Sequence, residues 1–86
     1  MEPERLPPPP FWRTRYFAFD VLLRRPYLDP LEIMRIIARP ERRQVQRDGR
    51  IRLWGYAASV DAYLRIVLLP DAGTVHNAFV DEDFSP

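Results

Sequence analysis

Four runs of alternating apolar and polar residues lie in residues 42–80, RRQVQRDGRIRLWGYAASVDAYLRIVLLPDAGTVHNAFV, and two turn signals join them in pairs. The first signal, Asp48-Gly49, is typical of a tight β-hairpin because these residues tolerate positive φ. The second is Pro70-Asp71-Ala72-Gly73, in which proline, aspartate and glycine favour turns. Period-two alternation on both sides of a turn indicates paired strands. The sequence therefore predicts two antiparallel hairpins, over residues 42–56 and 62–80.

A short helix is predicted directly before these hairpins. Asp29 is a typical N-cap, Pro30 fits the first helical position, and Glu32 can return the capping hydrogen bond. Pro40 ends the helix. The apolar residues between these limits are Leu31, Ile33, Met34, Ile36, Ile37 and Ala38. A helix of about ten residues is stable only when packed, so we expect this stripe to cover one face of a sheet.

Another strand is predicted upstream of the helix. The segment Phe11–Phe19, FWRTRYFAF, is rich in aromatic residues and alternates so that Phe17 and Phe19 share one face. Asp20 stands where an N-cap would, yet Pro26 leaves room for one helical turn at most. We therefore expect this segment to form the first strand of the sheet.

The predicted order of elements is strand, helix and four strands, without the regular alternation of a doubly wound fold. It indicates an α+β fold with an antiparallel five-stranded sheet and one main helix packed on one face. A chain of 86 residues has room for one domain, which we place at residues 11–86. Residues 1–10 contain five prolines and predict a disordered tail that joins no sheet.

Alternation assigns the strand residues to two faces of this sheet. The apolar set that we expect under the helix is Phe17, Phe19, Val45, Ile51, Leu53, Leu64, Ile66, Leu68, Val75 and Phe79. The opposite, open face then displays Tyr16, Gln44, Gln46, Arg50, Arg52, Trp54, Tyr56, Tyr63, Arg65 and His76. This face mixes basic and aromatic side chains. Three interpretations stay open: a nucleic-acid surface, a protein-binding surface, and the ordinary solvated face of an antiparallel sheet.

Composition restricts the chemistry that the open face can perform. All 13 basic residues are arginine, and residues 11–65 hold 12 arginines against six acids, an excess of +6 hidden in a net charge of +1. Arginine binds phosphate through a rigid fork of donors but is no ordinary proton acceptor. With no cysteine and one histidine, disulfide frameworks and the usual zinc motifs are excluded. We expect no metal site and no cofactor, and we interpret residues 81–83, Asp-Glu-Asp, as a solvated acidic end.

RNA is a ligand that the open face fits, because arginines bind phosphates and aromatic rings stack on unpaired bases. Proton transfer would run through His76, or through tyrosines whose pKa the arginines lower. Arg50, Arg52 and Arg65 would then orient a scissile phosphate and stabilise the charge of the transition state. These roles fit cleavage of RNA by its own 2′-hydroxyl. The competing interpretation is that His76 is a surface histidine with a structural hydrogen bond.

Three segments, Pro40–Gly55, Tyr63–Val67 and Thr74–Phe79, resemble a group of short uncharacterised bacterial proteins, and the similarity covers residues 16–84. This group is similar to the BrnT branch of the RelE/ParE toxin superfamily. In that superfamily a helical segment packs on an antiparallel sheet, and the open face acts on RNA or, in some branches, on gyrase. The resemblance implies a toxin with an antitoxin partner that covers the open face. It also implies that Arg50, Arg52 and Arg65 match the superfamily's basic strand residues, with His76 and Tyr63 as proton-transfer groups.

The leading hypothesis is a toxin-like RNA-binding protein. If the protein is also an enzyme, we expect it to be an endoribonuclease. Its candidate catalytic residues are His76, Arg65 and Tyr63, and its candidate RNA-binding residues are Arg50, Arg52, Trp54, Tyr56 and Tyr16. The alternative is a noncatalytic module in which Trp54, Tyr56 and neighbouring arginines bind a protein partner. Self-association into a homodimer through an edge strand fits either hypothesis. No apolar stretch approaches the ~20 residues that span a bilayer, so we expect a cytoplasmic protein without membrane contact.

Overall fold

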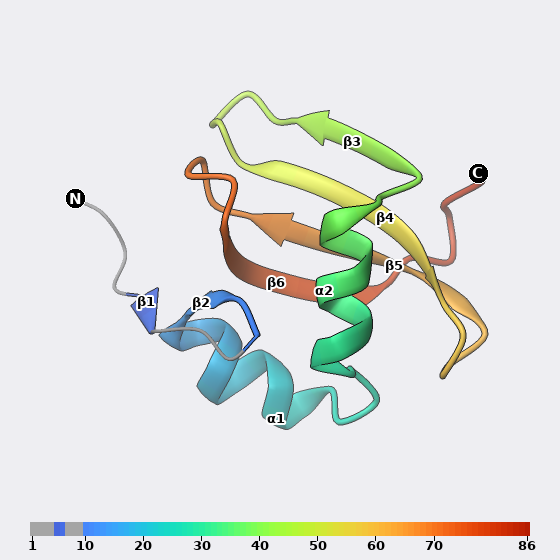
Figure 1. The fold of residues 1–86 in the computed structure, drawn as a ribbon, viewed down its shortest axis with the longest axis horizontal. Helices are drawn as coiled ribbons and strands as arrows, with labels where there is room; N and C mark the ends of the chain where they lie inside the picture. Colours follow the sequence, from blue (N-terminus) through green and yellow to red (C-terminus); the bar gives the residue numbers. More distant parts are fainter. Residues whose placement is uncertain (1–4, 7–9) are drawn as a thin grey trace.

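A mixed β-sheet forms the centre of the molecule, with α2 across one face and a second helical segment at one edge (Figure 1). The computed structural model describes residues 5–6 and 10–86. The strands lie in the order β1-β2-β6-β5-β4-β3. Their bounds are β1 (Arg5–Leu6), β2 (Trp12–Thr14), β3 (Arg42–Val45), β4 (Ile51–Ala57), β5 (Ala62–Leu68) and β6 (Thr74–Val80). The helical elements are the π-helix η1 (Phe17–Val21) and the α-helices α1 (Leu22–Arg24) and α2 (Pro30–Ala38).

The α+β class is confirmed, but the sheet is not purely antiparallel. Strands β3, β4, β5 and β6 form an antiparallel meander, whereas β2 runs parallel to β6 with Trp12 opposite Thr74. Only strands joined by a tight turn are obliged to run antiparallel. The chain leaves β2 into helices and reaches the sheet again at its far edge, so β2 is free of that constraint.

The predicted Pro-rich tail, residues 1–10, lies mostly outside the described residues. Its described pair, Arg5 and Leu6, forms β1, which is antiparallel to β2 with Leu6 opposite Arg13. The expectation that this segment joins no sheet is therefore wrong for these two residues. Neither is a proline, so both retain the N–H that a strand pairing uses.

The predicted first strand is the largest correction. Only Trp12–Thr14 of the aromatic segment is extended, and the chain is helical from residue 15 to residue 24. The reason is a helix cap: the Phe17 N–H donates to Thr14 Oγ1 at 3.1 Å. Phe17 and Val21, one turn apart, are both fully buried, whereas Phe19, expected in the core, is 59% exposed.

The role expected for Asp20 changes with this helix. Asp20 lies inside the π-helix instead of capping a turn, and it accepts a hydrogen bond from Arg24 Nε at 2.7 Å. The two residues are four positions apart, the spacing at which side chains meet on a helix. The helical stretch is therefore longer than the single turn that we expected before Pro26.

Helix α2 begins and ends where the sequence predicts. Asp29 Oδ1 accepts from the Leu31 N–H at 2.9 Å, Pro30 occupies the first turn, and the helix ends at Ala38. Ile33 and Ile36 are buried against the sheet, but Leu31 is 64% and Met34 41% exposed. Only part of the predicted apolar stripe therefore faces the core.

A glycine permits close approach between α2 and the sheet. A Cβ atom built at Gly55 of β4 would lie 2.7 Å from both Cγ atoms of Ile36. Any larger side chain at this position would push α2 away from β4.

Both predicted hairpins are confirmed. Strands β3 and β4 pair from Val45 opposite Ile51 to Arg42 opposite Trp54, and Gly49 in the turn has a φ of +89°. Strands β5 and β6 are joined by the turn at residues 70–73. Their alternation confirms the core positions Ile51, Leu53, Leu64, Ile66, Leu68 and Val75, all of which are buried.

A β-bulge in the second hairpin corrects the predicted face of Phe79. Val67 pairs with Asn77, but the next residue of β5, Leu68, pairs with Val75, so His76 is an extra residue in β6. One extra residue reverses the alternation beyond it. Ala78 therefore enters the core, and Phe79 lies opposite Arg65 on the open face.

Val45 is the other residue wrongly placed in the core, since it is 56% exposed. It lies on β3, which pairs with β4 alone and is exposed at all four residues. Figure 1 shows α2 crossing the middle of the sheet, with β3 at the outer edge. Edge position, and not the alternation pattern, determines the exposure of Val45.

Candidate nucleic-acid interface on the open face

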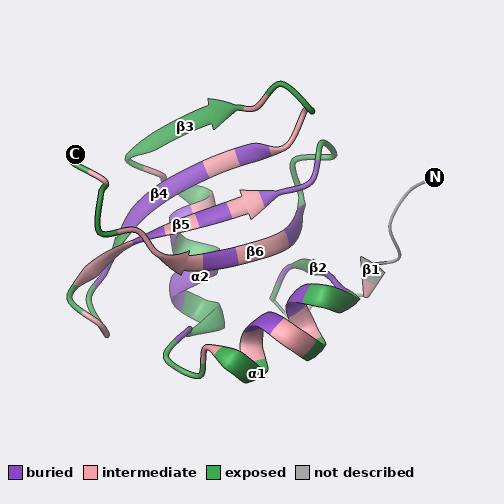
Figure 2. Ribbon diagram, turned by 180° about the vertical axis from the view of Figure 1, so that it is seen from behind, coloured by how far each residue is buried: buried purple, intermediate pink, exposed green. Residues whose placement is uncertain are grey.

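The open face is the side of the sheet opposite α2, and Figure 2 views the molecule from this side. Strand register arranges its side chains in three cross-strand rows. The central row is Arg42, Trp54, Arg65 and Phe79; the glutamine row is Gln44, Arg52, Val67 and Asn77; the tyrosine row is Tyr56 and Tyr63. The predicted grouping of Gln44, Arg52, Trp54, Tyr56, Tyr63 and Arg65 on one face is therefore confirmed.

The central row alternates cations and aromatic rings across four strands. Arg65 lies between two rings, with its Cζ 5.5 Å from the centroid of Trp54 and 5.1 Å from that of Phe79. A guanidinium between two aromatic faces is held by cation–π attraction and keeps its N–H edge available for anions. This geometry is suited to binding a carboxylate or a phosphate.

The anion that Arg65 binds is a residue of the same chain. Asp81 Oδ2 accepts hydrogen bonds from Arg65 Nη2 at 2.9 Å, from Arg65 Nε at 3.1 Å and from Trp54 Nε1 at 2.9 Å. The Asp81 side chain is 8% exposed. These donors, Trp54 first, hold the pKa of Asp81 below its usual value. The interpretation of residues 81–83 as a solvated acidic end is thus wrong for Asp81, although Glu82 and Asp83 are exposed.

An aromatic ring follows the carboxylate onto the same row. Phe84 stacks on Trp54 with centroids 5.4 Å apart and an interplanar angle of 11°, and its ring also contacts Tyr63 at 5.1 Å. The guanidinium of Arg42 also lies over the Phe84 ring, with its Cζ 4.9 Å from the ring centroid. Arg42 Nη2 donates a hydrogen bond to the Ser85 carbonyl at 3.3 Å. We call residues Asp81–Ser85 the C-terminal segment.

This segment covers the middle of the predicted interface. In Figure 2 it leaves β6 and runs past β5 and β4 toward β3. Trp54, predicted to stack on a base, is consequently only 6% exposed. The central row therefore holds an anion and an aromatic ring already.

The glutamine row lies outside these contacts. The guanidinium of Arg52 is half-buried and is within hydrogen-bonding distance of the Gln46 amide, whose oxygen we orient toward it. Arg50 lies beside this row, with its side chain 43% exposed and 3.8 Å from Asp48. An exposed ion pair at that distance contributes little. Arg50 and Arg52 therefore form the part of the basic face that is open to an external anion.

The tyrosine row does not contain an activated phenol. The hydroxyl of Tyr56 donates to Asp61, and this bond is the main cause of a raised pKa. The pKa of Tyr63 is also raised, first by burial and then by Glu41. The expectation that arginines lower these pKa values is wrong, because the nearest charged groups are carboxylates.

His76 is held at the β2 edge of the face. Its Nδ1 lies 3.1 Å from Thr14 Oγ1, and its ring is 5.1 Å from that of Tyr16. The Thr14 oxygen already accepts from Phe17, so its hydroxyl hydrogen can be donated to Nδ1, and we assign the ring hydrogen to Nε2. Burial, with a smaller effect of Arg50, lowers the pKa of His76. The ring is thus neutral at pH 7 and bonded as the competing structural interpretation expects.

The three candidate catalytic residues do not form one cluster. Arg65 and Tyr63 are two residues apart on β5 and face the same side. His76 lies much further along the sheet. Its neighbour Asn77 pairs with Val67, and Val67 is four residues from Tyr63 on β5, a separation of about 13 Å along the strand. The structure therefore brings Tyr63 and Arg65 together and leaves His76 with Tyr16, at the other end of the face.

Six contributors to the face were absent from the sequence-based set: Arg42, Val67, Asn77, Phe79, Asp81 and Phe84. Arg42 shares the alternation of Gln44 and was a detectable candidate. Phe79 was hidden by the bulge. Asp81 and Phe84 contact residues 27 positions or more away in the sequence, such as Trp54, and no local pattern marks such pairs.

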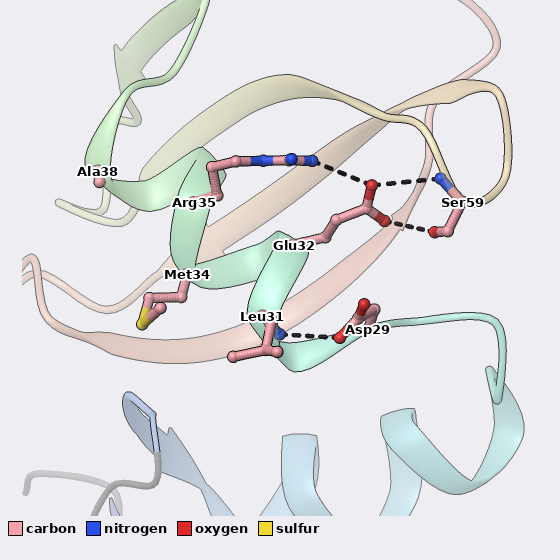
Figure 3. A pocket seen from close by; sticks show the side chains of 7 residues that line it. All are labelled: Asp29, Leu31, Glu32, Met34, Arg35, Ala38 and Ser59. Atoms are coloured by element: carbon pink, nitrogen blue, oxygen red, sulfur yellow. Dashed lines mark hydrogen bonds and ion pairs between the residues drawn. The ribbon is translucent and has the colours of Figure 1, made fainter.

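A pocket lies beside α2, on the other side of the sheet from the open face. This open pocket of about 740 Å³ is lined by Asp29, Leu31, Glu32, Met34, Arg35, Ala38 and Ser59 (Figure 3). The Glu32 carboxylate accepts from the Ser59 N–H and hydroxyl and from Arg35, instead of returning the helix cap as expected. Ser59 is the main cause of a lowered pKa of Glu32. Because this carboxylate is fully bonded, it fixes α2 to the β4–β5 turn and is not poised for chemistry.

Across residues 5–6 and 10–86, no group of three or more His, Cys, Asp or Glu side chains is placed to hold a metal ion. In the same part of the chain, no helix is long and apolar enough to cross a membrane.

Comparison with known proteins shows no family relationship for this chain. No protein-family model matches the chain, and no match was found among curated proteins or solved structures. Any functional conclusion therefore has to come from the chemistry of the site.

Proposed function

We propose that the protein binds single-stranded RNA through the open face. The observation that carries this proposal is the central row, in which arginines and aromatic rings alternate across four neighbouring strands. Neighbouring strands lie about 4.8 Å apart, so cations and stacking surfaces alternate at a spacing that can follow phosphates and splayed bases. Arg50 and Arg52 extend the basic surface beyond this row.

The resemblance to the BrnT branch of the RelE/ParE superfamily extends the proposal to a toxin with an antitoxin partner. Endoribonuclease activity is the catalytic form of this proposal, but His76 could not share a site with Arg65 and Tyr63, because it lies at the other end of the face. Within it, Arg65 is the residue with the best supported role, because its guanidinium already binds an oxyanion. A phosphate in that position would receive the same charge-assisted hydrogen bonds.

The first test is direct binding. Fluorescence anisotropy of a labelled single-stranded RNA of about ten nucleotides is measured at low salt with the wild type and with Arg52→Ala. We expect Arg52→Ala to weaken binding about threefold to tenfold and to reduce the dependence of affinity on salt, because one phosphate contact is lost.

Arg39→Ala is the charge-matched control, since it removes an exposed arginine at the end of α2, on the other side of the sheet. Equal losses for the two variants would mean that net charge, and not the open face, determines affinity. An absence of binding by a folded wild type at low salt contradicts the proposal, provided that Phe84→Ala also fails to bind.

A noncatalytic peptide-binding module is the second candidate, and one observation favours it. The occupant of the central row is a polypeptide segment, bound through Asp81 and Phe84. A module of this kind would bind a protein partner with little salt dependence, lose that affinity on Trp54→Ala, and not bind RNA.

A further inference from the structure

We propose that the central row is the main nucleotide subsite of the open face, and that the C-terminal segment is a tethered occupant that excludes RNA from it. This inference rests on the proposed RNA-binding function and adds a mutual exclusion to it. In the occupied state the Asp81 carboxylate takes the place of a phosphate on Arg65. The Phe84 ring takes the place of a base on Trp54.

The contacts of Asp81 are those that a phosphate oxygen would make. Its Oδ2 atom accepts from two nitrogens of Arg65 and from the indole N–H of Trp54, all between 2.9 and 3.1 Å. A phosphate offers oxygens of the same charge type to a guanidinium fork. A phosphate and Asp81 cannot both occupy the Nε–Nη2 edge of Arg65.

The contacts of Phe84 are those of a stacked base. Its ring is nearly parallel to Trp54, with an angle of 11° and a centroid distance of 5.4 Å, and Arg42 lies over it at 4.9 Å. A nucleobase stacks on tryptophan and below a guanidinium in the same manner. With Phe84 in place only 6% of Trp54 is exposed, which leaves no surface for a second ring.

The tether makes the occupant effective although its contacts are few. Asp81 follows directly after β6, so the segment is held at a high effective concentration over the row. Its ring and ion-pair contacts lie outside the apolar core. Release therefore leaves the fold intact, and RNA must compete with the segment for the row.

The experiment measures RNA affinity when the occupant is weakened. The probe is the labelled single-stranded RNA described above, and the variants are Phe84→Ala and Asp81→Asn. We expect each to bind RNA about threefold to tenfold more tightly than the wild type, because a larger fraction of molecules has an open row. In the double variant Trp54→Ala with Phe84→Ala, the gain should disappear.

Glu82→Gln is the matched control. It removes one negative charge from the same segment, as Asp81→Asn does, but Glu82 is exposed and outside the row. An equal gain in Glu82→Gln and Asp81→Asn would overturn the proposal, because net charge would then account for both. Far-UV circular dichroism verifies that every variant is folded.

The two proposals fail in different ways. If the wild type and Phe84→Ala bind RNA with the same affinity, the subsite and its occupant are overturned and RNA binding stands. If neither protein binds RNA, the RNA-binding function is overturned together with the subsite.

Discussion

The two faces of the sheet are both covered, but by different kinds of contact. The covered face, under α2 and η1, buries aliphatic and aromatic side chains such as Ile66 and Phe17 completely. On the open face, the C-terminal segment is held by one carboxylate, one stacked ring and two arginines. Apolar burial is insensitive to pH and salt, whereas charge-assisted bonds and exposed ion pairs are not. The first covering therefore stabilises the fold, and we expect acid to release the second covering before it disrupts the first.

The largest effect is expected on the covered face. Ile33 of α2 is fully buried, so Ile33→Ala should lower the free energy of unfolding by about 2–5 kcal/mol. Leu31, on the same helix, is 64% exposed, so Leu31→Ala should change the free energy of unfolding by less than about 0.5 kcal/mol. Urea unfolding followed by far-UV circular dichroism measures both values. Similar losses for the two variants would contradict the packing of α2 described above.

Gly55→Ala should produce the next largest effect. The added Cβ would lie 2.7 Å from the Cγ atoms of Ile36, and relieving this overlap should cost about 1–3 kcal/mol. In an Ile36→Ala background, Gly55→Ala should destabilise the protein much less, because the Cγ atoms that the new Cβ would meet are absent. A double-mutant cycle without coupling between these positions would show that α2 does not approach β4 at Gly55.

On the open face, acid should release the C-terminal segment before the fold is lost. The pKa of Asp81 in the folded protein lies below the ordinary value of about 3.9. Its contribution is therefore complete above the ordinary pKa and lost as the pH falls through the lowered one. Loss of the charge should weaken docking by about 1–2 kcal/mol. Trp54 fluorescence in a Trp12→Phe background measures the release.

Asp81→Asn is the control for this titration, because it should abolish the change in fluorescence. Glu32 also has a lowered pKa, caused mainly by Ser59, and it stabilises α2. Circular dichroism on the same samples separates its effect on the fold from release of the segment. A fluorescence change centred at or above the ordinary carboxyl pKa would contradict the bonds assigned to Asp81.

The smallest effect concerns His76. Burial is the larger cause of its lowered pKa and Arg50 the smaller one, so Arg50→Ala should raise the pKa toward the ordinary value without restoring it. NMR titration of the ring hydrogens measures the change. Arg39→Ala, at the end of α2, should leave the His76 pKa unaltered. A downward shift in Arg50→Ala would exclude a repulsive effect of Arg50.

Short sequence motifs correctly predicted the elements whose ends depend on neighbouring residues in the chain. Asp29-Pro30 fixes the start of α2, and Asp48-Gly49 fixes the first hairpin, because each involves residues close together in the chain. The segment after Thr14 was ambiguous, since Phe17 fits both alternation and a helical repeat. The cap from Thr14 decides for the helix.

The composition of the open face was partly predictable, and its covering was not. The alternation of β4 and β5 placed Trp54 and Arg65 correctly. The bulge at His76 reversed the face of Phe79, and its trace in the sequence is only the pair of adjacent polar residues His76 and Asn77. The docking of Asp81 joins residues that are distant in the chain, and only the folded sheet brings them together.

The edge strand β3 has a consequence for solubility. Its four residues are exposed and pair with β4 alone, so one row of backbone groups is available for another strand. Two of these residues, Arg42 and Arg43, are cationic. Pairing between the β3 strands of two copies would bring four arginines together, and their repulsion would oppose this pairing at low ionic strength. As salt screens this repulsion, aggregation through the edge becomes easier, so the protein is best concentrated in dilute buffer.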